Sequence, residues 1–389
     1  MKDQTKDVAP WNQAAGYQLP DDFSKRVISP ALVIYLDRVR HNLQSVIDRA
    51  GSVERWRPHV KTAKIPAVFA EYCRAGVAQF KCATTREAHE LLRVMRTNSV
   101  ANGDLLIAYP MTGPALIRLK QLAYEYSEFR LSVLCESAQS LVEIPENLSI
   151  FVDVNPGMHR TGIPLAQTET ILNIAGTAGS RFRGIHYYDG HLHQDDPSER
   201  RTAAFECYDQ LFGLLGELES SDIPVGEVIT CGTPTYPHAL AYPEFEKLSA
   251  TAHRISPGTV VYHDLRSHEL EPDSPLLPAA LVHARVVSHP SSDIVTCDAG
   301  SKSIAAEAGD PVAIALGFDN LNALSPSEEH LPFRVLAGEA PARGTCLQLF
   351  PRHVCPTVNL ASEAILMDGS EVVDVVQVSA RAHEILLAD

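Results

Sequence analysis

The chain has 389 residues, of which 45% are hydrophobic and 21% charged, which is ordinary for a globular protein. This length is too great for one ordinary core, so we expect two domains. The formal net charge of -15 disfavours nucleic acid and anionic membranes as main partners, because both attract clustered Lys and Arg.

Targeting features are weak along the whole sequence. No stretch approaches the roughly 20 apolar residues that a membrane helix needs. The start, MKDQTKDVAPWNQ, lacks the apolar core of a secretory signal. The eight cysteines are scattered without a CxxC pair, which is typical of reduced thiols. We therefore expect a cytoplasmic protein.

The first part of the chain alternates strand-like and helix-like runs. Eight strands are predicted, at residues 57–62, 80–84, 105–109, 130–135, 149–153, 184–188, 227–231 and in a short piece before Pro257. Helical patterns between them include residues 85–97, 113–126 and 202–218. This alternation predicts an α/β fold with a TIM (β/α)8 barrel over residues 25–268. A doubly wound open sheet is the alternative, which the absence of a G-x-G-x-x-G motif after the first strand disfavours.

The pattern changes after about residue 270. Strand-like runs separated by Gly, Pro and Asp cover residues 281–288, 293–297, 344–349, 357–360 and 371–379. They predict a second, mostly β domain over residues 269–389. Residues 1–24 show no strong pattern and are compatible with packing against this second domain.

Lys61 is the first candidate for chemistry. It ends a predicted barrel strand, and the active sites of TIM barrels lie at the strand ends. Because side chains alternate along a strand, Arg57 and His59 would share its face. A lysine that burial or a nearby cation keeps neutral can form a Schiff base with a carbonyl cofactor. A solvated surface lysine is the alternative.

Two glycine turns follow the seventh and eighth predicted strands. They are Gly232-Thr233-Pro234 and Ser256-Pro257-Gly258-Thr259. The loops at these two positions of a TIM barrel commonly bind a phosphate. Glycine allows close approach of the backbone N–H, and threonine adds a hydroxyl donor. Ordinary Gly/Pro turns are the alternative for each loop alone.

Polar residues also follow the fifth and sixth predicted strands. Arg160 follows the fifth and could donate to the phenolate oxygen of a cofactor, although a surface arginine would have the same sequence signature. The sixth strand ends in a run from His186 to His193 that includes Tyr188. Such a run at a barrel mouth indicates site lining or acid–base work, or else a partly exposed polar loop.

His353 and Cys355 form the last candidate pair. On an extended segment, residues two apart point the same way, so both side chains could reach one metal ion. Imidazole and thiolate favour Zn²⁺ over Mg²⁺ or Ca²⁺, and two protein ligands leave positions open for water or substrate. A bare H-x-C motif is also common by chance.

Taken together, these motifs resemble those of the fold-type III pyridoxal phosphate (PLP) enzymes of the D-serine dehydratase and D-threonine aldolase group, relatives of alanine racemase. The resemblance covers about residues 30–360. It is carried by the segments Arg57-Pro58-His59-Val60-Lys61-Thr62, Gly157-Met158-His159-Arg160-Thr161-Gly162, Gly232-Thr233-Pro234, Pro257-Gly258-Thr259, Glu329-His330 and His353-Val354-Cys355-Pro356-Thr357.

The resemblance implies site residues as well as a fold. PLP would be bonded to Lys61 beside Tyr188, with Arg160 at the cofactor's O3′. The backbone around Gly232, Thr233, Gly258 and Thr259 would hold the phosphate. His353 and Cys355 would bind a catalytic divalent metal, zinc on ligand softness, with Mn or Mg as alternatives. The resemblance also implies a homodimer.

The resemblance leaves two reactions open for a β-hydroxy D-amino acid. Dehydratases of the group tend to carry cysteine at the position of Cys355 and aldolases aspartate, so we expect dehydration and deamination to a 2-oxo acid and ammonia. Retro-aldol cleavage to glycine and an aldehyde, with His193 as base, is the alternative. A PLP-binding protein without turnover fits less well, because a pure carrier needs no metal. A racemase fits less well because it would want a second acid–base residue facing Lys61 from the β domain, and the sequence identifies none. Two positions depart from the family pattern. Ala63 stands where the family usually has histidine, and residues 187–193 match neither branch closely.

Overall fold

The computed structural model describes residues 17, 19–20 and 22–386, and it divides into two compact units. The barrel unit comprises residues 44–258 and 269–272 and the described residues from Ala382 onward. The sheet unit comprises the described residues up to Leu43, residues 259–268 and residues 273–381. The domain limits 25–268 and 269–389 remain a prediction.

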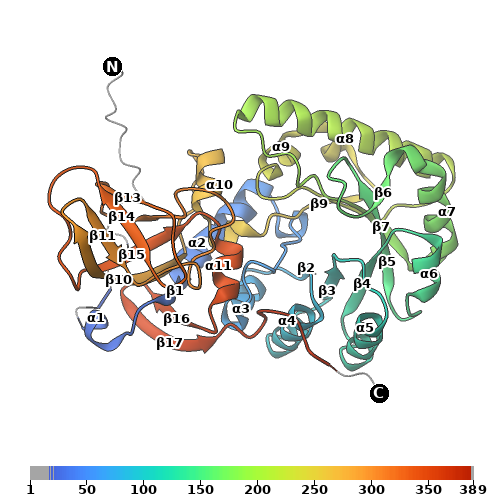
Figure 1. Ribbon diagram of the computed structural model, residues 1–389. Helices are drawn as coiled ribbons and strands as arrows, with labels where there is room; N and C mark the ends of the chain where they lie inside the picture. The colour runs from blue at the N-terminus through green and yellow to red at the C-terminus, as the bar shows by residue number, and fades with distance from the viewer. Residues whose placement is uncertain (1–16, 18, 21, 387–389) are drawn as a thin grey trace. The chain divides into compact units, whose positions relative to one another are not determined.

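The barrel unit is built on a curved parallel sheet whose strands follow chain order (Figure 1). Residues 56–60 join its two edges, because the N–H of Arg57 donates to the carbonyl oxygen of Ile255 and the N–H of Lys81 to that of Pro58, both at 2.9 Å. The isolated bridges to both edges are parallel, so the sheet closes and the predicted TIM barrel is confirmed. The strands are β2 (Gln79–Cys82), β3 (Asp104–Ile107), β4 (Arg130–Cys135), β5 (Ser149–Asn155), β7 (Phe182–Tyr187), β8 (Glu227–Thr230) and β9 (Ala252–Ile255), with the short β6 (Ile163–Pro164) beside β5.

Helices cover the outer side of this sheet, as α4 to α7 in Figure 1 illustrate. The sequence sets both the start and the inner face of α4. The side-chain oxygen of Thr84 accepts the N–H of Glu87 at 3.0 Å, while Leu91 and Met95, one helical turn apart, are fully buried. The three predicted helices are confirmed. The barrel helices are α3 (Pro66–Arg74), α4 (Thr85–Thr97), α5 (Pro114–Glu125), α6 (Ala138–Glu143), α7 (Thr168–Ala178), α8 (Pro197–Ser220) and α9 (Tyr236–Ala241).

The sheet unit confirms the predicted, mostly β second domain. Its mixed sheet has the order β13-β14-β11-β10-β1-β16-β17, and β15 pairs with β10 and β12. The strands are β1 (Ala31–Tyr35), β10 (Ala280–Ser291), β11 (Ile294–Cys297), β12 (Ala313–Ala315), β13 (Leu321–Ala323), β14 (Leu331–Val335), β15 (Cys346–Pro351), β16 (Glu363–Asp368) and β17 (Glu371–Gln377). Helices α1 (Phe23–Arg26) and α11 (Val354–Leu360) belong to this unit, while α2 (Leu36–Ala50) and α10 (Leu265–Leu270) begin in it.

Two segments of the sheet unit differ from the sequence prediction. The strand β1 was not predicted; it pairs antiparallel with β10 and parallel with β16, far away in the chain. The strand predicted at residues 357–360 is wrong, because these residues lie in the helix α11. Val354, Thr357 and Val358 are β-branched, a type common in strands, but their i, i+3, i+4 spacing puts all three on one buried helix face.

A buried ion cluster lies inside the barrel at the amino-terminal ends of its strands. Arg57 is fully buried and donates through Nε and Nη2 to both carboxylate oxygens of Glu227, at 2.7 and 2.9 Å. Its Nη1 donates to Asp104 at 2.9 Å. Arg183 pairs with Asp104 at 2.9 Å and Arg254 with Glu227 at 3.2 Å. Arg57 was predicted to share a strand face with His59 and Lys61. Its guanidinium belongs to this ion cluster and stabilises the barrel.

Two further expectations concern the chain as a whole. Within the described residues, no helix is long and apolar enough to cross a membrane. All eight cysteines lie in described segments, and each is a free thiol, in agreement with the predicted absence of a disulfide framework.

Candidate active site

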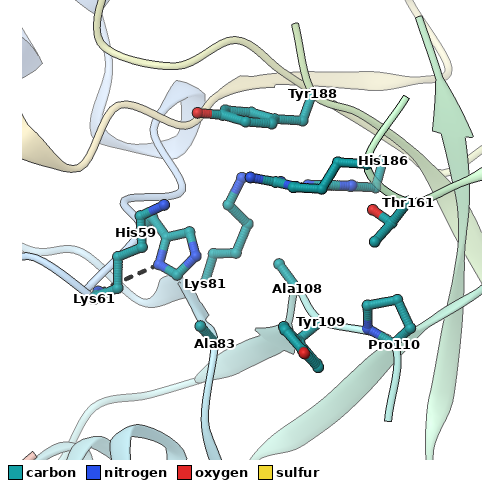
Figure 2. A pocket seen from close by; sticks show the side chains of 11 residues that line it. His59, Lys61, Lys81, Ala83, Ala108, Tyr109, Pro110, Thr161, His186 and Tyr188 are labelled. Carbon is teal, nitrogen blue, oxygen red and sulfur yellow. Dashed lines mark hydrogen bonds between the residues drawn. The ribbon is translucent and has the colours of Figure 1, made fainter. Parts of the chain in front are cut away.

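A cavity of about 420 Å³ opens at the carboxyl ends of the barrel strands, a volume in the range of ligand-binding pockets (Figure 2). Its walls come from the ends of the first strand segment, β2 and β7 and from the loops after β3 and β5. The lining residues are His59, Lys61, Lys81, Ala83, Ala108, Tyr109, Pro110, Arg160, Thr161, His186 and Tyr188. Lys61, Arg160 and Tyr188, which were predicted separately from the sequence, thus line one cavity.

Lys61 lies in the turn that follows the first strand segment, next to His59. The backbone N–H of Lys61 donates to Nδ1 of His59 at 3.3 Å, the contact drawn as a dashed line in Figure 2. Burial, followed by the positive charges of Lys61 and Lys81, holds the pKa of His59 well below its usual value. The His59 imidazole is therefore neutral around pH 7 and accepts this hydrogen bond.

Lys81 is a functional candidate that the sequence reasoning missed. It lies in β2, its residue is 2% exposed, and Figure 2 shows its side chain rising toward His186 and Tyr188. Its Nζ lies 3.4 Å from Nε2 of His186, and Nδ1 of His186 lies 2.7 Å from the carboxylate of Asp153. A lysine between Phe80 and Cys82, inside an apolar strand, was the available signal.

Two cationic side chains of the cavity lie close to the aromatic ring of Tyr188. The guanidinium carbon of Arg160 lies 5.2 Å from the ring centroid, and Nζ of Lys81 lies 5.3 Å from it. The ring of His186 is nearly parallel to that of Tyr188, at 14°. The loop that carries Arg160 is shaped by Asn155, whose Oδ1 accepts the N–H groups of Gly157 and His159 at 2.9 and 3.0 Å.

The glycines predicted to bind phosphate lie against residues of the cavity wall. A Cβ on Gly258 would lie 2.5 Å from the carbonyl oxygen of His59, and a Cβ on Gly232 would lie 3.1 Å from the Tyr188 ring. Glycine is therefore needed at Gly258 for close backbone approach. Asp189, fully buried, fixes the other turn by accepting the hydroxyl of Thr235 at 2.8 Å and the N–H of Gly232 at 3.2 Å.

Three more predicted residues, like Gly232 and Gly258, do not line this cavity. Thr233 is half-buried in the turn after Gly232. Thr259 belongs to the sheet unit, where its hydroxyl lies 3.5 Å from the sulfur of Cys355. His193 is exposed, and its Nδ1 contacts the carbonyl oxygen of His191 at 2.8 Å. The catalytic role of His193 stays a prediction.

His353 and Cys355 meet in the sheet unit, although not on the expected strand. His353 has extended backbone and precedes α11, whereas Cys355 lies in its first turn. A hydrogen bond to Cys355 raises the pKa of His353 to about 9 despite its burial. Burial would raise the pKa of the Cys355 thiol, but the hydrogen bond and charge of His353 lower it below its usual value.

The wider surroundings of this pair bear on metal binding. Nδ1 of His353 lies 2.5 Å from the carboxylate of Glu307, which resembles the carboxylate–histidine contact that orients metal-binding imidazoles. Within the described parts of the chain, no group of three or more His, Cys, Asp or Glu side chains is arranged to hold a metal ion. The donor atoms of His353 and Cys355 nevertheless converge, and as imidazole and thiolate they fit a borderline-soft ion such as Zn²⁺.

Family models match both units of the chain. Residues 34–263 match the alanine racemase N-terminal domain, and residues 279–367 match a serine dehydratase domain. The chain belongs to the alanine racemase N-terminal domain family. The predicted resemblance to the fold-type III PLP enzymes is therefore confirmed, with a PLP barrel followed by a β domain.

Characterised relatives span nearly the whole chain. A D-threonine aldolase from Arthrobacter sp. is 27% identical, covering 93% of this chain and 95% of the relative. A D-threo-3-hydroxyaspartate dehydratase from Delftia sp. (strain HT23) is 25% identical, covering 88% and 95%. The crystal structure of D-threonine aldolase from Filomicrobium marinum superposes with a TM-score of 0.79 at 25% identity, over 91% of this chain and 95% of that one. The predicted class, a PLP-dependent lyase of this family, is confirmed.

Proposed function

We propose that the chain is a PLP- and metal-dependent lyase that dehydrates and deaminates a β-hydroxy D-amino acid to a 2-oxo acid and ammonia. The observation that carries this proposal is the position of Lys61. Its side chain lines a cavity at the carboxyl ends of the barrel strands, together with Arg160 and Tyr188. In a TIM barrel this is the end at which catalytic groups gather.

The residues around the cavity fit PLP. The cofactor is anionic, and the wall carries the cationic groups Lys61, Lys81 and Arg160 in a chain whose net charge is -15. Lys61 would bond to the cofactor aldehyde, Arg160 would donate to O3′, and the Tyr188 ring offers a face for stacking. The backbone around Gly232, Thr233, Gly258 and Thr259 would hold the phosphate. When bound, PLP supplies an electron sink for charge that develops at Cα.

Each remaining step is assigned to a side chain. The Lys61 amine, when free, would remove the Cα proton of the substrate. Arg160 would orient the cofactor ring through its hydrogen bond to O3′. The Tyr188 ring covers one side of the site and excludes water from it.

His353 and Cys355 are proposed to bind the divalent metal, with zinc favoured and Mn or Mg as alternatives. A metal there would supply Lewis-acid assistance to departure of the β-hydroxyl group. Glu307 would orient the imidazole of His353. The chain would form a homodimer, as its resemblance to the family implies.

Retro-aldol cleavage to glycine and an aldehyde is the second candidate. One specific observation favours it: the aldolase from Arthrobacter sp. is slightly more similar to the chain, at 27% identity, than the dehydratase, at 25%. In that reaction His193 is the proposed base for the β-hydroxyl proton. Cysteine at position 355 supports the dehydratase reaction.

Product analysis separates the two reactions. The protein, supplied with PLP and Zn²⁺, would be incubated with D-serine, D-threonine and D-threo-3-hydroxyaspartate, with each L-enantiomer and an EDTA-treated sample as controls. We expect 2-oxo acid and ammonia from a D-substrate, with the yield lost in EDTA. Glycine and an aldehyde would establish the aldolase reaction instead. Turnover without any dependence on metal would contradict the role of His353 and Cys355.

A further inference from the structure

We propose that Lys81 is a second anion-binding residue of the cavity, which acts with Arg160 beside the Tyr188 ring to bind an oxyanion of the ligand. This inference rests on the proposed function in taking a pyridoxine-type phosphate ester as that ligand. The buried amine of Lys81 is positioned for an anion whichever reaction the protein catalyses.

The geometry supports a ligand-binding role because Lys81 reaches the cavity from within the barrel. Its residue is 2% exposed, yet the side chain lines the cavity. Its Nζ lies 5.3 Å from the centroid of the Tyr188 ring, and the guanidinium of Arg160 lies 5.2 Å from the same centroid. Two cations thus border one aromatic ring, and the second of them, Arg160, is the residue proposed for O3′.

A comparison with Lys64 shows what Lys81 lacks. Lys64 is also buried, at 8% exposure, and its Nζ forms an ion pair with Glu87 at 2.7 Å. Within the described residues, no carboxylate lies within ion-pair distance of Lys81. The carboxylate of Asp153 contacts His186, whose other ring nitrogen lies 3.4 Å from Nζ of Lys81. A buried ammonium without a counter-ion is costly, so a ligand anion is the natural partner for Lys81.

The charges that face Lys81 are mostly positive. Burial, followed by the charge of Lys61, lowers the pKa of Lys81 to about 7. Asp153 and the Cys231 thiol act in the opposite direction, and Arg160 adds to the lowering. The titratable and charged groups that face Lys81 from the surrounding elements are His59, Lys61, Asp153, Arg160, His186 and Cys231.

It follows that entry of an anion should draw a proton onto Lys81. Near pH 7 only part of the Lys81 population is charged before binding, because its pKa is about 7. An oxyanion beside the amine favours the charged form, so binding takes up protons from solution. Without the anion, Lys81 destabilises the fold, and an apolar residue of similar shape should be tolerated or better.

The test compares Lys81→Met with the wild type and with the control Lys247→Met, a lysine of the same unit whose side chain is 68% exposed. Binding of pyridoxine 5′-phosphate, which has no aldehyde and cannot bond to Lys61, would be measured by calorimetry in two buffers of different ionisation enthalpy. We expect proton uptake in the wild type and in Lys247→Met. Lys81→Met should lose that uptake and bind roughly tenfold more weakly or worse, as loss of a charge-assisted hydrogen bond predicts.

The thermal midpoint of the ligand-free protein gives the second readout. Lys81→Met should melt at the same temperature as the wild type or higher. If Lys81→Met melts lower, fails to fold, or binds the ester with wild-type affinity and proton uptake, Lys81 is a structural lysine and the proposal is overturned. Inorganic phosphate alone serves as a third probe. Lys81-dependent binding of phosphate would identify the phosphate as the oxyanion, and its absence would point to the ring oxygen.

The two proposals fail in different ways. If PLP forms no covalent bond to the wild-type protein, but Lys81→Met still weakens binding of the ester, the lyase assignment fails and the anion site stands. If PLP bonds normally to both proteins and the ester shows no dependence on Lys81, the anion site fails and the lyase assignment stands.

Discussion

The buried ion cluster around Arg57 gives a sharp prediction of relative stability. In the native cluster, three guanidinium groups, from Arg57, Arg183 and Arg254, share the two carboxylates of Asp104 and Glu227. Glu227→Gln would leave three cations with one carboxylate. Arg57→Met would leave two cations and two carboxylates, with Arg183 still paired to Asp104 and Arg254 to Glu227. The conservative loss of a carboxylate should therefore destabilise the barrel more than the loss of its central arginine.

The magnitudes follow from the contacts. Removing one partner of a buried pair typically costs about 3–5 kcal/mol, because an uncompensated charge remains. Glu227→Gln should fall in this range, since Arg57 is fully buried and keeps Asp104 as its remaining carboxylate partner in the cluster. Arg57→Met leaves no excess charge but does leave buried acceptors unpaired, which should cost about 1–3 kcal/mol.

Trp56 provides the assay, because it is fully buried and adjacent to Arg57. The sequence has two tryptophans, so a Trp11→Phe background leaves Trp56 as the fluorescent reporter of barrel unfolding in urea. Glu244→Gln is the matched control; its exposed pair with Lys247 should contribute less than about 1 kcal/mol. If Arg57→Met proves as destabilising as Glu227→Gln or more, the charge-balance reasoning is refuted.

Three further predictions concern the site and the sheet unit. Gly258→Ala should weaken PLP binding about tenfold, because the added Cβ would lie 2.5 Å from the carbonyl oxygen of His59 and displace the backbone. Fluorescence titration with PLP measures the affinity, and an unchanged affinity would show that the close approach is irrelevant. Cys355→Ala should keep the absorbance of protein-bound PLP but lose most lyase activity, and added Zn²⁺ should not restore it; retention of EDTA-sensitive turnover would exclude Cys355 as a ligand. His283→Phe should make the free energy of unfolding depend less on pH in the acid range. Burial lowers the pKa of His283 from 6.5 to about 4 in the folded wild-type protein. The unfolded wild-type chain therefore binds the proton first, and stability is lost as the pH falls from 6.5 toward 4. The free energy of unfolding of the variant, measured in urea across that interval, should fall less steeply by up to about 1.4 kcal/mol per pH unit, and an unchanged slope would contradict the assignment.

The barrel and much of its cavity could be predicted because their signals are local. Strands of a parallel barrel all end at one mouth, so residues that follow different strands come together without any knowledge of distances. Lys61, Arg160 and Tyr188 were placed in this way, and the structure brings them to one cavity. The alternation of strand and helix patterns was sufficient for this step.

Features that depend on distant pairing could not be predicted. The strand β1 pairs with β16, more than 300 residues further along the chain, and nothing in the segment 31–35 itself indicates this neighbour. Lys81 was inside a predicted strand, but its direction into the cavity follows from the register between β2 and residues 56–60. Cys355 was placed on an extended segment because residues two apart share one face of a strand, but it lies in the first turn of α11.

The cavity contains two lysines, so the most direct test of the proposed function is to locate the lysine that bonds to PLP. The protein would be loaded with PLP, reduced with borohydride and digested, and the modified lysine identified by mass spectrometry. We predict modification of Lys61, in the peptide around His59, with Lys81 unmodified. Modification of Lys81 in place of Lys61, or of neither, would contradict the assignment of Lys61 as the cofactor-binding lysine.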